Sequence, residues 1–162
     1  MRQIIEDYKK SLKPNVTEEF INIVFFRPLA FLLVLPVKNI NFSPNYYTSV
    51  SLLCGIASGV CFGLGKLELG ALLLIIMIIF DCSDGQLARV KEISTRYGKM
   101  YDGVADILSY NAMLMGLAYH QFQRFPDFVL VGISAFIVLA LNVFFFDQFK
   151  NQYIGYIHYH YG

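Results

Sequence analysis

The chain has 162 residues, of which 56% are hydrophobic and only 15% are charged, and its formal net charge is +1. A water-soluble domain of this length has no core large enough to hide so many apolar side chains, so the soluble class is excluded. The small net charge gives no electrostatic reason to expect a nucleic-acid partner. We therefore predict an all-α integral membrane protein with a single domain over residues 1–162.

Residues 1–45 are predicted to form an N-terminal segment at the membrane surface. Residues 1–13 are polar and of mixed charge, so they do not have the pattern of a secretory signal. Residues 20–37 are apolar, but Arg27 and Pro28 stand in the middle and Pro36 stands near the end. A charge and a proline at the centre make a poor membrane crossing. We expect this stretch to be an interfacial helix, kinked at a proline.

Residues 46–147 are predicted to form a bundle of transmembrane helices. A turn signal at residues 43–45 comes before the first apolar stretch, and short polar connections separate the later ones. Each stretch is close to the roughly 20 residues that a bilayer requires. The sequence predicts four crossings, at residues 46–64, 69–87, 100–122 and 128–146.

Glycines recur at every fourth position of the first expected crossing, at Gly55, Gly59 and Gly63. Because glycine has no side chain, a stripe of this kind lets a neighbouring helix approach closely. The neighbour is either another helix of the same chain or the same helix of a second copy.

Basic residues predict the orientation of the crossings. The connection between the second and third crossings holds Arg89, Lys91, Arg96 and Lys99, whereas the connections on the opposite side hold one cation each. Basic residues favour the cytoplasmic side, and the basic N-terminus falls there too if residues 20–37 do not cross. The tail, residues 148–162, holds His158 and His160 among tyrosines and is expected to be interfacial.

Four aspartates lie near the cytoplasmic ends of the second and third expected crossings. Asp81 and Asp84 stand at positions i and i+3 and share one face of a helix. Asp102 and Asp106 stand at i and i+4 and do the same on the next helix. Carboxylates are costly within a membrane and indicate function, and two converging pairs would repel each other strongly unless divalent cations bind. Oxygen donors without histidine or cysteine favour magnesium, manganese or calcium over zinc.

The residues around these aspartates form the pattern Asp-x2-Asp-Gly-x2-Ala-Arg-x8-Gly-x3-Asp-x3-Asp, which starts at Asp81 and ends at Asp106. This pattern resembles the signature of the CDP-alcohol phosphotransferase (CDP-alcohol phosphatidyltransferase) family. Two further elements are similar to family elements, namely Pro-Asn-x-x-Thr at residues 44–48 and Arg-Pro at residues 27–28. Without a functional site, the first pair of aspartates would cap a helix end and the others would pair with nearby cations.

The resemblance implies an activity and a set of roles. Family members transfer a substituted phosphoryl group from a CDP-linked donor to an alcohol and release CMP, in phospholipid biosynthesis. They usually have six crossings and form homodimers. The resemblance assigns Asp81, Asp84, Asp102 and Asp106 to two Mg²⁺ or Mn²⁺ ions, with Asp106 also as the general base. It assigns the CDP moiety to Asn45, Thr48, Gly85, Ala88, Arg89 and Gly98.

Several alternatives stay open. Arg96 and Lys99 bind an anionic acceptor or face anionic lipid headgroups. The donor is CDP-diacylglycerol or a small CDP-alcohol, and Ile107, where many members carry Lys or Arg, favours an uncharged acceptor. A transporter that carries a cation or proton on the aspartates is a second reading of the chain. A shortened, inactive relative that acts as a partner in a membrane complex is a third.

Overall fold

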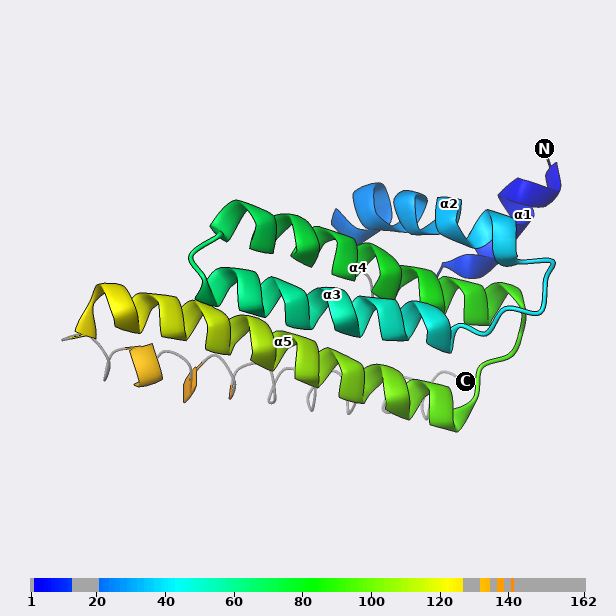
Figure 1. Ribbon diagram of the computed structural model, residues 1–162. Coiled ribbons are helices and arrows are strands. Elements are labelled where there is room, and N and C mark those ends of the chain that lie inside the picture. The colour runs from blue at the N-terminus through cyan, green and yellow to red at the C-terminus, as the bar shows by residue number, and fades with distance from the viewer. Residues whose placement is uncertain (1, 13–20, 127–131, 135–136, 139–140, 142–162) are drawn as a thin grey trace, which may run out of the picture. The chain divides into compact units, whose positions relative to one another are not determined.

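The computed structural model describes residues 2–12, 21–126, 132–134, 137–138 and 141, and every regular element in this part of the chain is helical, as the sequence predicts. The chain divides into two compact units, Met1–Gly116 and Leu117–Gly162, and everything described below for the candidate site lies in the first. The fourth expected crossing lies mostly outside the described residues, and the tail lies wholly outside them. The helices are α1 (Arg2–Ser11), α2 (Arg27–Val37), α3 (Asn45–Gly63), α4 (Leu67–Val90) and α5 (Arg96–Arg124) (Figure 1).

Helices α3 and α4 run antiparallel and side by side (Figure 1). The chain reverses between them at Gly65, whose φ of 75° is a conformation that glycine adopts without steric cost. Two buried serines of α3 bond to the backbone of α4: the Ser51 hydroxyl donates to the Met77 carbonyl at 3.2 Å, and the Ser58 hydroxyl donates to the Gly70 carbonyl at 2.7 Å. Hydroxyl-to-carbonyl bonds of this kind hold apolar helices together where water is absent.

Helix α5 packs against the glycines of α3. A Cβ on Gly55 would lie 2.5 Å from the Ser109 side chain, and a Cβ on Gly59 would overlap the Ala112 carbonyl. Gly116 in turn rests on the backbone of Gly59. The partner of these glycines is therefore a helix of the same chain, which is one of the two arrangements that the stripe predicts.

The N-terminal segment packs on α4. A π-helical turn, Asn22–Phe26, leads into α2, and Pro28 stands in the first turn of α2, where its missing N–H leaves no bond unmade. The Ser83 hydroxyl donates to the Ala30 carbonyl at 3.3 Å, and the Gln86 amide donates to the Arg27 carbonyl at 3.1 Å. Two side chains from the aspartate-bearing end of α4 thus fix the position of α2.

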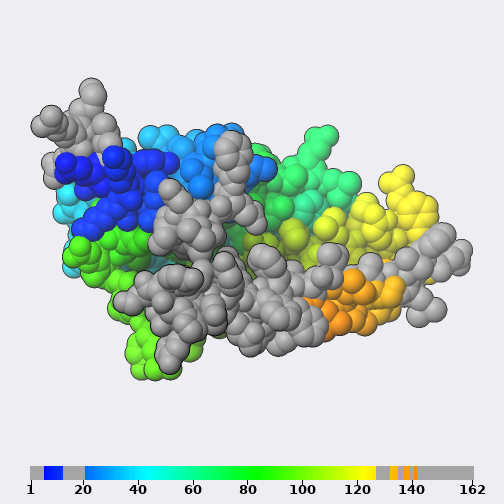
Figure 2. Space-filling view, turned by 180° about the vertical axis from the view of Figure 1, so that it is seen from behind, coloured from blue at the N-terminus to red at the C-terminus, as the bar shows by residue number. Residues whose placement is uncertain are grey.

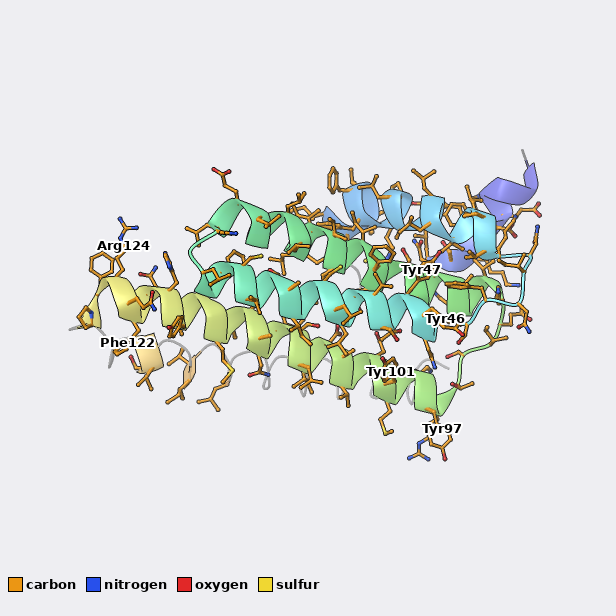
Figure 3. The ribbon with its side chains drawn as sticks, viewed as in Figure 1. Tyr46, Tyr47, Tyr97, Tyr101, Phe122 and Arg124 are labelled. Atoms are coloured by element: carbon orange, nitrogen blue, oxygen red, sulfur yellow. The ribbon has the colours of Figure 1, made fainter. Side chains whose placement is uncertain are left out.

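The core between α2, α3 and α4 includes one of the two tyrosines in the first turn of α3. Tyr46 is exposed, but Tyr47 is buried and its hydroxyl donates to the Leu33 carbonyl at 2.7 Å (Figure 3). The buried cluster comprises Phe31, Val34, Tyr47 and Leu87.

Within the described part of the chain, one helix, α3, meets the length and composition that a membrane crossing needs. The apolar stretch Asn22–Val37 is too short to qualify. Helices α4 and α5, where the second and third crossings are expected, do not meet this criterion.

Candidate metal and nucleotide site

A cavity of about 610 Å³ lies where the C-terminal end of α4 meets the N-terminal ends of α2, α3 and α5. All four aspartates of the sequence pattern line it, and so do all six residues predicted to contact the CDP moiety. Residues that are 57 positions apart in the chain, from Asn45 to Asp102, therefore share one cavity. The remaining lining residues are Arg27, Ser43, Pro44, Cys82, Ile93, Ser94, Thr95 and Lys99.

Three carboxylates converge in this cavity. Asp81 of α4 and Asp102 and Asp106 of α5 each offer an oxygen, and these oxygens lie within 4.8 Å of one another. The Asp106 carboxyl is also within hydrogen-bonding reach of Asp81. Oxygens on opposite sides of a bound Mg²⁺ or Ca²⁺ lie about 4–5 Å apart, so the spacing and chemistry of these donors fit a hard divalent cation.

Asp84 differs from the other three aspartates. It is only 5% exposed, and it accepts a hydrogen bond from the Thr48 hydroxyl of α3 at 2.5 Å. This bond ties α3 to α4 at the edge of the cavity. The sequence predicts convergence of four carboxylates; the close group holds three, and Asp84 lies beside it in the same cavity.

The small residues of the pattern make room for polar neighbours. A Cβ on Gly85 would lie 3.4 Å from Nη1 of Arg89, and one on Gly98 would lie 3.5 Å from the Asn45 side-chain oxygen. The Gly98 N–H donates to the Thr95 hydroxyl at 3.0 Å, which satisfies an otherwise unpaired amide at the start of α5. A larger side chain at either glycine would press on a residue that lines the cavity.

Two basic residues in the first turn of α5 lie differently. Lys99 lines the cavity, whereas Arg96 is exposed and outside the lining. The predicted role of either residue in acceptor binding stays a prediction. Tyr97, between them in sequence, points away from the neighbouring helices, and Tyr101 contacts Ser49 of α3 at 3.0 Å between hydroxyl oxygens (Figure 3).

Arg27 is the charged lining residue to which the sequence gives no role in the site. It is 6% exposed, at the start of α2 and directly after the π-helical turn. A charged residue in the middle of an apolar stretch is a signal of function, and a π-helical turn often accompanies one. The Arg-Pro pair carried the first of these signals, but the sequence does not show which helix α2 packs against.

A family model for CDP-alcohol phosphatidyltransferase matches residues 41–157, which is more than half of the chain and includes every aspartate of the cavity. The chain belongs to this family. The resemblance that the signature indicates is thereby confirmed, and the family is membrane-bound. Asp81, Asp102 and Asp106 could hold a metal ion, and the family uses divalent cations.

Curated relatives of this chain match over part of their length. The phosphatidylinositol phosphate synthase of Mycobacterium bovis (strain BCG / Pasteur 1173P2) is 30% identical over 90 residues, covering 52% of this chain and 42% of the relative. The phosphatidylinositol phosphate synthase of Mycobacterium marinum (strain ATCC BAA-535 / M) is 29% identical over 117 residues, covering 72% of this chain and 50% of the relative. The chain spans about half the length of the curated relatives it matches.

Proposed function

We propose that this protein transfers a substituted phosphoryl group from a CDP-linked donor to an alcohol and releases CMP. The observation that carries the proposal is the group formed by Asp81, Asp102 and Asp106, whose oxygens lie within 4.8 Å of one another in a cavity of about 610 Å³. The cavity is large enough for a nucleotide. Its acidic cluster and its small and polar residues are the parts that a nucleoside diphosphate with divalent cations requires.

Asp81, Asp102 and Asp106 would hold the divalent cations, with Asp84 beside them. Mg²⁺ or Mn²⁺ bound there, as two ions, would offset the charge of the diphosphate and stabilise CMP as it leaves. The hydrogen bond from Thr48 orients Asp84 from the adjacent helix, so that this carboxylate keeps one position.

Asp106 is the residue proposed to take the proton from the acceptor hydroxyl. It lies one helical turn from Asp102 and is half-buried at the wall of the cavity. A carboxylate next to cations is a weak base, so its contribution comes from the position of the hydroxyl more than from its basicity. On the nucleotide side, Asn45, Thr48, Gly85, Ala88, Arg89 and Gly98 are proposed to hold the CDP moiety.

The acceptor is proposed as an alcohol, and the donor as CDP-diacylglycerol or a small CDP-alcohol. The relatives' name, phosphatidylinositol phosphate synthase, supports a phosphatidyl donor and an inositol phosphate acceptor. Lys99 in the lining would suit such an anionic acceptor, whereas Ile107 favours an uncharged one. We place the cavity on the cytoplasmic side of a membrane crossed by four helices, and we propose a homodimer by analogy with the family.

The direct test measures CMP release by the purified protein, supplied with each donor, a panel of acceptors that includes inositol phosphate, and Mg²⁺ or chelator. Asp106→Asn removes the proposed base. Glu68→Gln is the matched control, because Glu68 is an exposed carboxylate. It lies in the first turn of α4, the helix that also carries Asp81. We expect release that requires Mg²⁺ and one acceptor, is lost in Asp106→Asn and is unchanged in Glu68→Gln.

The same experiment separates the alternatives. Folded protein that releases no CMP with any pair of substrates would support an inactive relative that acts within a membrane complex. Cation or proton flux in liposomes without nucleotide, lost in Asp106→Asn, would support a transporter. Release that persists in Asp106→Asn would remove this residue from the role of base.

A further inference from the structure

We infer that α1 is part of the nucleotide site, because it fixes the direction of the Arg89 side chain. The inference rests on the proposed function, in which Arg89 faces the CDP-linked donor. Arg89 stands in the last turn of α4 and lines the cavity. Its Nε–H donates to the carbonyl oxygen of Ser11, the last residue of α1, at 2.5 Å.

The contact with Ser11 sets the direction of the guanidinium. This group is a planar fork, so an anchor at Nε determines where its two terminal nitrogens point. Those nitrogens lie over Gly85: Nη1 and Nη2 are 3.4 and 3.6 Å from the point that a Cβ on Gly85 would occupy. Gly85 is itself part of the cavity wall, so the anchored fork lies along the surface proposed to receive the diphosphate.

The end of α1 is suited to this contact. The last carbonyl groups of a helix have no partner within the helix and carry a partial negative charge, which favours an arginine. Ser11 is fully buried, and its hydroxyl donates to the Tyr8 carbonyl at 2.6 Å. The Tyr8 ring meets the Phe31 ring of α2 edge-on, with centroids 5.1 Å apart. In the space-filling view, α1 lies directly against α2 and the end of α4 (Figure 2).

Two ion pairs hold α1 against the rim of the cavity. Lys10 pairs with Glu92, directly after α4, at 2.7 Å, and Asp7 pairs with Lys38, directly after α2. Each pair joins α1 to a segment that follows a helix of the cavity wall. Helix α1 is thus tied to the segments that follow α4 and α2, so its position, and with it the direction of the Arg89 guanidinium, is set without a ligand.

An arginine whose direction is already set loses less freedom when it binds an anion. Displacement of α1 would therefore weaken the binding of the CDP moiety while it leaves the carboxylates of α4 and α5 in place. We therefore expect the KM for the donor to rise and the affinity for CDP to fall, while kcat changes little.

Ser11→Leu tests the contact, because a larger side chain at a fully buried position pushes the end of α1 away from Arg89. Lys9→Leu is the matched control: it adds the same side chain to the same helix at an exposed position. We expect Ser11→Leu to raise the donor KM and the dissociation constant for CDP roughly tenfold, with kcat within about twofold. Lys9→Leu leaves all three unchanged.

Arg89→Lys provides the second arm, since lysine cannot present a fork while it bonds to Ser11. If α1 acts through Arg89, the double variant Ser11→Leu/Arg89→Lys binds CDP no more weakly than Arg89→Lys alone. If instead the double variant weakens CDP binding by the product of the two single effects, then α1 acts independently of Arg89 and the inference is overturned. Equal CDP affinity in Ser11→Leu and Lys9→Leu would overturn it too.

Hydrogen exchange separates this inference from the proposed reaction, and its first arm uses the unaltered chain. CDP with Mg²⁺ should slow amide exchange in residues 2–11 of the unaltered chain, because coupling between α1 and the nucleotide acts in both directions. The slowing should disappear in Arg89→Lys. This result would support the role of α1 even if no acceptor gave CMP release, and unchanged exchange on addition of CDP would overturn it.

Discussion

The two ends of the α3, α4 and α5 assembly are built in opposite ways. At one end, Gly59 of α3 meets the backbones of Ala112 and Gly116 of α5, and Gly70 of α4 meets the Phe62 ring of α3. At the other end, α4 and α5 carry four carboxylates, which repel one another and line an open cavity together with Asn45 and Thr48 of α3. Close contact at the glycine end fixes the helices relative to one another. Because the helices are fixed there, the acidic end can hold carboxylates of like charge close together.

The largest effect should follow from a change at the acidic end. Asp81→Asn removes one of the three converging carboxylates. We expect the rate of Mg²⁺-dependent CMP release to fall roughly a hundredfold to a thousandfold, which corresponds to a loss of several kcal/mol of transition-state stabilisation. The fold should survive, because one of the repelling charges is gone. The measurement is CMP release together with thermal unfolding.

Unfolding with Mg²⁺ sharpens this test. The ion should raise the unfolding temperature of the unaltered chain, since it binds the folded state, and should raise that of Asp81→Asn less. An equal rise in both chains would place the bound ion away from Asp81. Lost activity together with a collapsed fold would mean that Asp81 supports the structure.

A change at the glycine end should cost stability first. Gly59→Leu places a side chain where a Cβ already overlaps the Ala112 carbonyl, and backbone cannot move aside as a side chain can. We expect the free energy of unfolding to fall by about 3 kcal/mol, the upper part of the range for overpacked sites. Loss of CMP release should follow, because the same contact sets the spacing of the helices at the cavity.

Gly103→Ala is the control for Gly59→Leu. No atom lies within 4 Å of the Cβ that Gly103 would gain, so the helix should gain about 0.5–1 kcal/mol of stability from lower backbone entropy. Comparable losses in the two variants would contradict the idea that close contact at Gly59 holds the helices.

The bond between Thr48 and Asp84 is an interhelical contact, like those at the glycine end, but it is made at the acidic end. Thr48→Val keeps the shape and removes the donor. We expect a loss of about 1–2 kcal/mol in unfolding free energy, at the low end for a buried charged acceptor because cavity water can replace the hydroxyl. Thr48→Ser should retain stability, and equal losses in both variants would assign the effect to packing.

Much of the fold follows from local patterns in the sequence. Apolar runs interrupted by charges and glycine give the bounds of α3, α4 and α5 to within a few residues, and helical spacing alone puts Asp102 and Asp106 on one face. Family membership was also within reach, because eight fixed residues in a short window are specific. These features depend on neighbours a few positions away.

What the sequence does not show depends on tertiary packing. Residues 2–11 are polar enough to pass for an irregular terminus, and the bond between Ser11 and Arg89 joins positions 78 residues apart. Likewise, nothing local decides that Tyr47 turns inward while Tyr46 stays exposed. Arg27 lies in the cavity only because Ser83 and Gln86 bind the backbone of α2. Each of these contacts needs a partner from a distant segment.

The smallest expected effect concerns the exposed rim, where Lys10 donates a hydrogen bond to Glu92 and holds the pKa of that carboxyl below its ordinary value. A lowered pKa in the folded state means that the pair favours docking of α1 above the ordinary pKa of glutamate and stops doing so as the pH falls through the lowered value.

Glu92→Gln should therefore raise amide exchange in residues 2–11 slightly at neutral pH and not at all at low pH. The ion pair between Asp7 and Lys38 is common to both chains, so it does not distinguish them. A difference between the chains that grows as the pH falls would contradict the assignment, since protonated glutamate and glutamine are nearly equivalent partners for Lys10.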